Sequence, residues 1–403
     1  MAPRLPNGWA YRELGDLVRI ESGGTPSRSN SDYWGEATPW ITAKDLKTFD
    51  LVDSQERLSD AGAARASVAP KDTVLVLVRG MGLFKDVPIG VTRRPMAFNQ
   101  DVKALHPNDD VSARFLGHSL QAQRHYLMGK VDMAGHGTGR LPTDVLESLP
   151  LPIPSPKEQR RIVAVLDASD RRAHQLNALV RARRQYHEQL VNKLYQSGEG
   201  HTKQAKLGSI LVESRQDGTH GDVARKLTVK LYGKGVIAKP ERLSGSAETQ
   251  YYVRQAGQLI YSQLDFLNGA IGIIPQGLDG FESTADLPAF GISATVNPVW
   301  LLGYLTRRSY YTRRVDIARG QRIARRVKPQ DFLDSPIRIP PRSIQDKVAT
   351  ALSTSQGLVE LSIHLHDAIE KQKRGLMQKL LTGQWRLARD QTGDLSDREM
   401  AHA

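Results

Sequence analysis

Two long stretches of the chain place apolar residues at alternating three- and four-residue steps, the spacing that gives an α-helix one apolar face. The first extends from Lys157 to about Gln196 and contains neither proline nor glycine, and the second extends from Gln345 to about Leu381. Each stretch predicts one long helix, about 60 Å in length at ~1.5 Å per residue. The apolar positions are Ile162, Leu166, Ala173, Leu176, Val180, Leu190 and Leu194 in the first stretch and Leu358, Leu361, Leu365, Ile369, Leu376 and Leu380 in the second.

Neither apolar face can be buried by its own helix alone, and the two predicted helices are matched in length. We therefore expect them to pack against each other as an antiparallel coiled coil within the chain. Arg183 and His187 interrupt the apolar face of the first helix. The alternative is that each helix docks separately on its own globular unit.

The segment before each long helix has the pattern of a mixed unit, in which short β-branched strands are separated by glycine turns. Val74–Val78 and Ile89–Val91 are the predicted buried strands of the first segment, and Phe115 to about Leu127 has helical spacing. Leu259–Tyr261 and Ala270–Ile274 are the predicted strands of the second segment. The predicted fold class is therefore α/β (α+β).

One passage of the sequence occurs twice without a gap, 186 residues apart. Pro150–Pro154 and Gln159 in the first copy correspond to Pro336–Pro340 and Gln345 in the second. Solenoid units span roughly 20–50 residues, so this longer period indicates duplication of a whole domain and a pseudo-twofold arrangement. Each proline run predicts a stiff extended connector, because proline removes a hydrogen-bond donor and restricts the residue before it.

These patterns divide the chain into five parts. They are a first α/β unit at residues 1–155, a central long helix at 156–200, a second α/β unit at 201–342, a C-terminal long helix at 343–387 that pairs with the central one, and a polar tail at 388–403 that we expect to be disordered.

The charge balance favours a polyanionic partner. The 403 residues carry a net charge of +13, and lysine and arginine displace condensed counterions from a phosphate backbone. Charge that serves solubility alone is the simpler alternative. The chain has no cysteine, and its longest strongly apolar run, Val74–Val78, is too short to span a bilayer. We expect a cytoplasmic protein without a membrane partner.

Positive charge is concentrated at residues 301–330, which contain nine basic residues and one acid, with Tyr304, Tyr310 and Tyr311 between them. Arginine can make bidentate contacts to phosphate or guanine, and tyrosine can donate to phosphate oxygens. A solvated surface normally mixes both signs of charge, so this stretch favours a nucleic-acid contact. The corresponding stretch of the first unit, Gly135–Arg140, is glycine-rich, which would allow close approach of the backbone to a phosphate.

No part of the sequence carries a convincing catalytic or metal site. Asn297–Trp300 differs by one residue from the Asn-Pro-Pro-aromatic loop of amino-methyltransferases, and a helix start is the simpler interpretation. Gly135–Gly139 is similar to a dinucleotide loop, but Pro142 lies where the following helix would have to run. There is no Gly-x4-Gly-Lys-Ser/Thr loop for ATP, and the eleven histidines lack the spacing of metal ligands.

Short motifs at the openings, connectors and helix ends form a recognisable set: Leu5–Trp9 with Leu14–Asp16, Gly23–Pro26 with Trp40–Thr42, Leu151–Pro154 with Glu158–Val163, and Lys373–Gly383. Together they resemble the specificity subunit of a Type I restriction–modification system. The resemblance covers about residues 5–387, and the connector followed by a long helix, which occurs twice, makes it specific. Ser343–Gln345 departs from the Glu-Gln that the family prefers after the prolines, which weakens any inference about partner contacts there.

The resemblance implies a DNA-binding subunit rather than an enzyme. Two target-recognition domains would each read one half of a split DNA sequence, and the paired helices would set the unspecified spacer. The implied partners are double-stranded DNA, two modification subunits that methylate adenine, and two restriction subunits that act as motor nucleases. The cofactors S-adenosylmethionine, ATP and magnesium would belong to these partners and none to this chain.

Two other functions remain open: a stand-alone DNA methyltransferase, and a coiled-coil scaffold that organises protein partners without sequence-specific DNA binding. The candidate DNA contacts are Lys44, Arg79, Lys85, Arg93, His136, Thr138 and Arg140 in the first domain and Arg215, Lys234, Arg319, Gln321, Arg322, Arg325 and Arg326 in the second.

Overall fold

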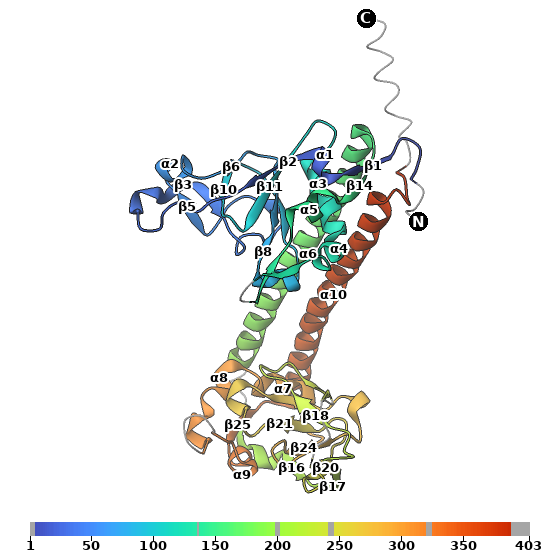
Figure 1. The fold of residues 1–403 in the computed structure, drawn as a ribbon. Helices are drawn as coiled ribbons and strands as arrows, with labels where there is room; N and C mark the ends of the chain where they lie inside the picture. The colour runs from blue at the N-terminus through green and yellow to red at the C-terminus, as the bar shows by residue number, and fades with distance from the viewer. Residues whose placement is uncertain (1–4, 135–136, 198–201, 241–245, 320–324, 388–403) are drawn as a thin grey trace, which may run out of the picture. The chain divides into compact units, whose positions relative to one another are not determined.

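The computed structural model describes residues 5–134, 137–197, 202–240, 246–319 and 325–387 (Figure 1). The polar tail expected at residues 388–403 lies outside this part of the chain. The chain forms two compact units, one made of Met1–Gln175 with Leu365–Ala403 and the other of Leu176–His364. Each unit contains a segment of both long helices, and each is described by itself.

Among the described residues four sheets form the strand framework of the first unit, one of them made of its first and last strands. Two predicted strands are confirmed, because β7 (Val74–Leu77) and β9 (Ile89–Thr92) are buried along their whole length. They belong to a five-stranded sheet of order β2 (Val18–Ser22), β11 (Val102–Pro107), β7, β9, β4 (Asp50–Leu51). A four-stranded sheet has the order β5 (Glu56–Leu58), β3 (Trp34–Ile41), β10 (Met96–Phe98), β6 (Val68–Ala69). A small three-stranded sheet has the order β12 (Asp132–Ala134), β13 (Thr138–Arg140), β8 (Arg79–Gly80).

The helix α3 (Ala113–Ala122) packs on β7 and β9, and Ser112 caps it by accepting a hydrogen bond from the Phe115 N–H (3.3 Å). The single helix predicted as far as Leu127 is wrong in one respect, because the backbone leaves helical geometry at Gln123 and resumes in α4 (Arg124–Met128). The break turns Leu127 into the core, where it is fully buried. Three shorter helices complete the unit: α1 (Leu14–Leu17), α2 (Asp60–Ala63) and α5 (Thr143–Glu147).

The second unit repeats the mixed plan with shorter strands. Its main sheet has the order β16 (Leu211–Ser214), β24 (Ala289–Ile292), β21 (Leu259–Tyr261), β22 (Ile271–Ile273), which confirms both predicted strands. Tyr261 stacks on Phe290 at 5.8 Å between ring centroids and lies 4.8 Å from Phe332. The remaining elements are β17 (Gln216–His220), β20 (Gln250–Val253), β23 (Glu282–Ser283), the hairpin β18 (Leu227–Val229) and β19 (Val236–Ala238), α7 (Pro298–Leu305), α8 (Arg308–Tyr311) and α9 (Pro329–Leu333).

Both proline connectors are extended, as predicted, and each pairs with the strand that opens its unit. The first connector, β14 (Pro150–Ile153), pairs antiparallel with β1 (Ala10–Glu13). The second, β25 (Pro336–Ile339), pairs antiparallel with β15 (Lys203–Lys206). The sequence duplication is therefore matched in the structure, because in each unit the first strand pairs with the last.

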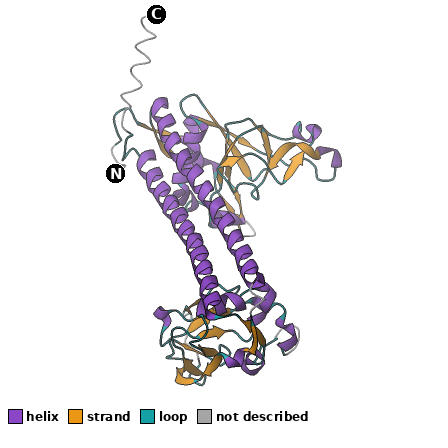
Figure 2. Ribbon diagram, turned by 180° about the vertical axis from the view of Figure 1, so that it is seen from behind, coloured by secondary structure: helices purple, strands orange, loops and turns teal. Residues whose placement is uncertain are grey.

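Both long helices form over the predicted ranges, as α6 (Pro156–Ser197) and α10 (Arg342–Leu381). In the second unit Arg183 of α6 bonds to Ser362 of α10 (2.5 Å) and His187 bonds to Ser355 (3.1 Å), so the two segments are antiparallel (Figure 2). The predicted fold class of mixed units with an antiparallel helix pair is confirmed. Among the described residues, no helix combines the length and apolarity needed to cross a membrane.

The buried face of α10 is displaced from the predicted one. Leu358, Leu361 and Leu365 were expected at the helix interface, but they are 45%, 53% and 47% exposed. Ser355 and Ser362 are buried instead, because their hydroxyls receive the long side chains of α6 described above. Small polar residues make room for these side chains, and the leucines consequently turn outward.

The two alternatives for burying the long helices both hold in part. Ile162 and Leu166 of α6 belong to the core of the first unit, together with Leu380 of α10. Val348 and Leu352 of α10 belong to the core of the second unit. The ends of the helices therefore dock on the globular core within each unit, and within each unit the two helix segments also contact each other.

A buried glutamine near the start of α6 ties three segments together. The Gln159 side chain is 1% exposed and donates through Nε2 to the carbonyls of Pro154 (3.1 Å) and Asp110 (2.7 Å). Its Oε1 accepts from the N–H of Ser112, the cap of α3, at 3.0 Å. One amide thus joins the connector, the loop before α3 and the long helix.

Gln345 repeats this arrangement in the second unit. It is 1% exposed, its Nε2 donates to the carbonyl of Pro340 (2.9 Å), and its Oε1 accepts from the N–H of Asn297, the cap of α7 (2.8 Å). The matched glutamines of the sequence repeat are therefore matched in their hydrogen bonds.

We predict that Gln159→Ala and Gln345→Ala each destabilise their own unit by about 2–4 kcal/mol, because buried backbone groups lose their partners. Chemical denaturation monitored by amide hydrogen exchange would assign the loss to α3 or to α7. Gln356→Ala is the matched control, since Gln356 is an exposed residue of α10. Equal stability of all three variants would contradict the prediction.

Candidate nucleic-acid interface

Two of the predicted DNA contacts in the first unit lie directly opposite each other. Arg79 on β8 and Arg140 on β13 are cross-strand partners, and both side chains are exposed. Like charges in this position are destabilising in an antiparallel sheet. Among the described residues neither guanidinium has an ion-pair partner. Asp132 of β12 is the cross-strand partner of Arg140 on its other side, which leaves Arg79 the less compensated of the two, and a bound anion would relieve the remaining repulsion.

The same small sheet brings further predicted residues into the neighbourhood. Thr138 is on β13, and Lys85 ends the short turn that follows β8, with its N–H bonded to the carbonyl of Gly82 (2.9 Å). Met81 and Met133 are each 77% exposed beside these cations. A surface that offers both charge and apolar side chains is suited to contact phosphates and base edges together.

The glycine-rich segment has a structural reason that the sequence did not reveal. A Cβ on Gly139 would lie 3.1 Å from the carbonyl oxygen of Gly80 and 3.1 Å from Leu83, so glycine permits the close pairing of β13 with β8. His136, the other candidate of this segment, lies outside the described residues.

Lys44 and Arg93 lie apart from this sheet. Arg93 follows β9 and forms ion pairs with Asp50 (3.6 Å) and Asp72 (3.8 Å), so its charge is already compensated. Lys44 is exposed in the turn after β3, where its N–H bonds to the Thr42 hydroxyl (3.3 Å). The three strands of the small sheet therefore hold the denser group of candidates.

In the second unit two arginines of the basic stretch are joined through their backbones. Arg319 and Arg326 exchange backbone hydrogen bonds of 2.9 and 2.8 Å. The Arg319 side chain bonds to Asp331 (2.5 Å) and that of Arg326 bonds to Asp286. Arg325 is half-buried, while Gln321 and Arg322 lie outside the described residues.

The interleaved tyrosines do not serve the predicted purpose. Tyr310 and Tyr311 are 5% and 6% exposed and belong to the core of the second unit, so their hydroxyls are not presented to phosphate. Tyr304 packs against the Arg307 guanidinium at 4.3 Å from its ring centroid. The tyrosine spacing reflects core packing, and the expectation of phosphate contacts from Tyr310 and Tyr311 is wrong.

The other two candidates of the second unit occupy different places. Lys234 is exposed in the loop between β18 and β19, 5.7 Å from the ring centroid of Tyr232. Arg215 bonds to Glu213 (3.0 Å) and lines a cavity together with Arg254, a buried arginine that the sequence did not single out. Arg254 directly follows β20, whose residues are all half-buried, so no pattern in the sequence marked it.

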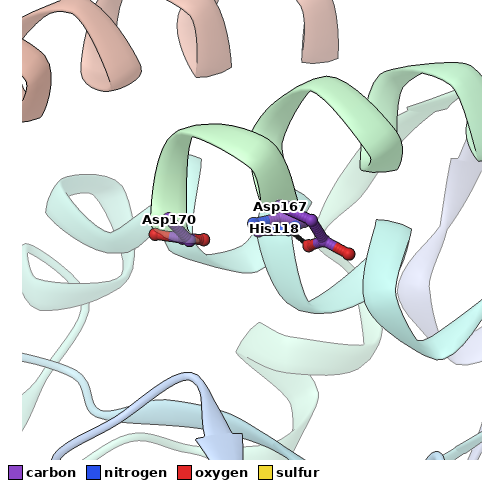
Figure 3. Close-up of side chains that lie close together, drawn as sticks. All are labelled: His118, Asp167 and Asp170. Carbon is purple, nitrogen blue, oxygen red and sulfur yellow. Dashed lines mark hydrogen bonds and ion pairs between the residues drawn. The ribbon is translucent and has the colours of Figure 1, made fainter. Parts of the chain in front are cut away.

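A cluster of titratable groups joins α3 to α6 in the first unit (Figure 3). His118 of α3 and Asp167 of α6 point toward each other, with Nε2 and Oδ1 3.0 Å apart, and Asp170 lies one turn further along α6. Arg114 donates to both oxygens of Asp167 at 2.8 and 2.6 Å, and Lys373 of α10 pairs with Asp170. Two cations thus occupy the carboxylates, and an added divalent metal ion would have to displace them.

The cluster has uneven pKa values. Burial lowers the pKa of His118, and the hydrogen bond to Asp167 offsets this only in part. Burial alone would raise the pKa of Asp167, but the hydrogen bonds from His118 and Arg114 outweigh it and hold the pKa at about 2. The arrangement fits an internal ion-pair network that fastens α3 to the long helices.

Comparison with known proteins shows what the first unit and the fold are similar to. Residues 6–183 match the Type I restriction modification DNA specificity domain. Over 163 residues the chain is 26% identical to the Type I restriction enzyme EcoR124I/EcoR124II specificity subunit of Escherichia coli, covering 40% of each chain. Over 178 residues it is 28% identical to the Type I restriction enzyme MjaIX specificity subunit of Methanocaldococcus jannaschii, covering 41% of this chain and 39% of that one. The matched segments span about two fifths of these curated relatives.

The likeness in structure extends further than the likeness in sequence. The crystal structure of the Type I restriction–modification S subunit from M. genitalium matches 94% of this chain and 99% of its own, with a TM-score of 0.57 and 14% sequence identity. At that identity the match concerns the fold alone. The resemblance predicted from the sequence motifs is confirmed.

We predict that the first unit loses stability as the pH falls through the ordinary histidine pKa of ~6.5, because burial lowers the pKa of His118 and the unfolded chain therefore takes up the proton more readily than the folded one. His118→Gln keeps a donor for Asp167 and should flatten this dependence, as measured by the hydrogen exchange of α3 against pH. His125→Gln, at an exposed position of α4, is the control. An unchanged slope in His118→Gln would assign the effect to another group.

Proposed function

We propose that this chain, which carries a Type I restriction modification DNA specificity domain at residues 6–183, is the specificity subunit of a Type I restriction–modification complex. Each of its two units recognises one half of a bipartite DNA site, and α6 and α10 set the spacer between the halves. Partner modification subunits methylate adenine with S-adenosylmethionine, and partner restriction subunits cleave DNA with ATP and magnesium. The chain itself supplies recognition and no catalysis, in the cytoplasm.

The observation that carries this proposal is a duplicated frame with two different polar surfaces. The pairing of first and last strands and the buried glutamine recur in both units, whereas their exposed cations do not correspond. The first unit presents Arg79 and Arg140 on a small sheet, and the second presents the backbone-paired Arg319 and Arg326. Two units with the same framework but different exposed cations are suited to recognise two different half-sites.

The two alternative functions have less support. The Asn297 side chain, which would have to accept an amino group in a methyltransferase, caps α7 by accepting from Val299 and Trp300, and its amide donates to Asp346 (2.7 Å). This is the helix start that the sequence favoured. A scaffold without DNA recognition gives no reason for two arginines to face each other across strands with no ion-pair partner among the described residues.

A methylome tests the proposal directly. The chain would be expressed with its modification subunit in a host without adenine methylation, and modified adenines would be mapped by single-molecule sequencing. A split motif with a fixed unspecified gap supports the proposal. A well-formed complex that leaves no modified adenine contradicts it and favours the scaffold.

We predict that replacing both Arg79 and Arg140 with alanine relaxes one half-site and leaves the other unchanged. A lost base contact costs about 1–3 kcal/mol, so discrimination at that half should fall roughly ten- to hundredfold. Methylome mapping of the variant gives the result, with the exposed Arg65→Ala as the control. Equal relaxation of both halves would contradict separate recognition by the two units.

We also predict that the spacer follows the length of the helices. Removing one turn of α6 around Arg183 together with the facing turn of α10 around Ser362 shortens the pair by about 6 Å, at ~1.5 Å per residue. The spacer should then shorten by about two base pairs, since each base pair occupies ~3.4 Å. Retention of the original spacer in a folded variant would contradict the proposal that the length of the two helices sets the spacer.

A further inference from the structure

The second unit contains a cavity of about 240 Å³ whose lining combines apolar surface with charged side chains. Three of its lining residues are cations, Arg215, Arg254 and Lys328, and one is an anion, Glu213. A water molecule occupies ~30 Å³ in the liquid, so the cavity has room for a polyatomic ligand. The charges around it sum to a clear positive excess.

Arg254 is the unusual member of this lining. It is 2% exposed, its Nε donates to the hydroxyl of Ser283 (2.7 Å), and its Nη1 donates to the carbonyl of Ser214 (2.7 Å). Both acceptors are neutral, and among the described residues no carboxylate forms an ion pair with the guanidinium. A buried cation without a counter-charge is costly.

The electrostatics of Arg254 agree with this geometry. Burial lowers its pKa to about 10, and the charge of Glu213 offsets the shift only in part. The Glu213 carboxylate is already bonded to Arg215. The side chain remains charged at neutral pH, and Glu213, which it shares with Arg215, balances only part of that charge.

The cavity is next to the paired arginines Arg319 and Arg326 of the second unit. Lys328 lines the cavity two residues after Arg326. Arg326 also bonds to Asp286, the neighbour of the lining residue Ala285. A polyanion that approaches Arg326 would therefore meet the cavity as well.

We propose that this cavity binds a phosphate of the DNA backbone, with Arg254 as its buried counter-ion and Lys328 and Arg215 at its rim. The inference rests on the proposed function, because it takes DNA to be the polyanion. A phosphate supplies the full negative charge that the guanidinium lacks, whereas the edge of a guanine offers acceptors without neutralising it. The contact positions the second unit on DNA and carries no sequence information of its own.

The test uses the full chain and a duplex that carries its methylome-defined site. Arg254→Gln and Lys328→Ala should each weaken binding roughly ten- to hundredfold, equally for matched and mismatched half-sites. Each should make the plot of log Kobs against log salt shallower by about 0.9, the value for one phosphate contact. Glu213→Gln should tighten binding, because it removes the competing anion, and the exposed Lys347→Ala is the control.

Replacing single phosphates by methylphosphonates adds a readout that does not depend on folding of a buried variant. Neutralising the contacted phosphate should weaken the wild type strongly and Lys328→Ala less, because this variant loses the rim cation and keeps Arg254. Loss of discrimination at one base pair with an unchanged salt slope would overturn the phosphate assignment in favour of a base contact. Unchanged binding by both variants would overturn the site itself.

Inorganic phosphate separates failure of this inference from failure of the proposed function. Stabilisation of the wild type by phosphate ions, absent in Arg254→Gln, supports the cavity as an anion site even for a chain that shows no DNA specificity. A chain that binds its site specifically but gains no thermal stability from phosphate, and whose variants bind like the wild type, contradicts the cavity and leaves the proposed function intact.

Discussion

The buried glutamine at the start of each long helix is the contact on which both units depend. Gln159 and Gln345 hold a helix, a proline connector and the cap of a second helix through hydrogen bonds to backbone groups only. Backbone acceptors and donors are present whatever side chains surround them. The junction therefore tolerates extensive substitution of other residues, provided that the glutamine amide is kept and remains buried from water.

This division between a fixed junction and variable surfaces explains why the two halves look alike in their cores and unlike in their charges. The glycines at the openings repeat the pattern, since a Cβ on Gly15 would lie 3.3 Å from the Glu147 carbonyl and one on Gly208 would lie 3.4 Å from that of Leu333. Close packing at equivalent points keeps the frame constant. Exposed strands and loops then supply different cations on each frame, as the proposed recognition of two half-sites requires.

Local sequence patterns predicted most of the helices and strands but few of the contacts between them. Apolar periodicity and the absence of breakers were enough for α6, and β-branched runs were enough for β7 and β9. The leucines of α10 were misassigned because the polar partners Arg183 and His187 choose the buried face, and periodicity cannot weigh a hydrogen bond across two helices. The pairing of Arg79 with Arg140 and the isolation of Arg254 depend on strand register between distant segments, which no local pattern contains.

The first unit is completed by residues from both ends of the chain, and this has a consequence for its synthesis. Met377, Leu380 and Leu381 are buried in the same core as Leu166. About 200 residues separate these contributions, so at ~5–20 residues per second a ribosome needs roughly 10–40 s to deliver the missing part. The second unit is continuous in sequence and can fold within that interval. During this interval the nascent first unit exposes part of its apolar core to water and is prone to aggregate. We therefore expect a chaperone to assist its synthesis.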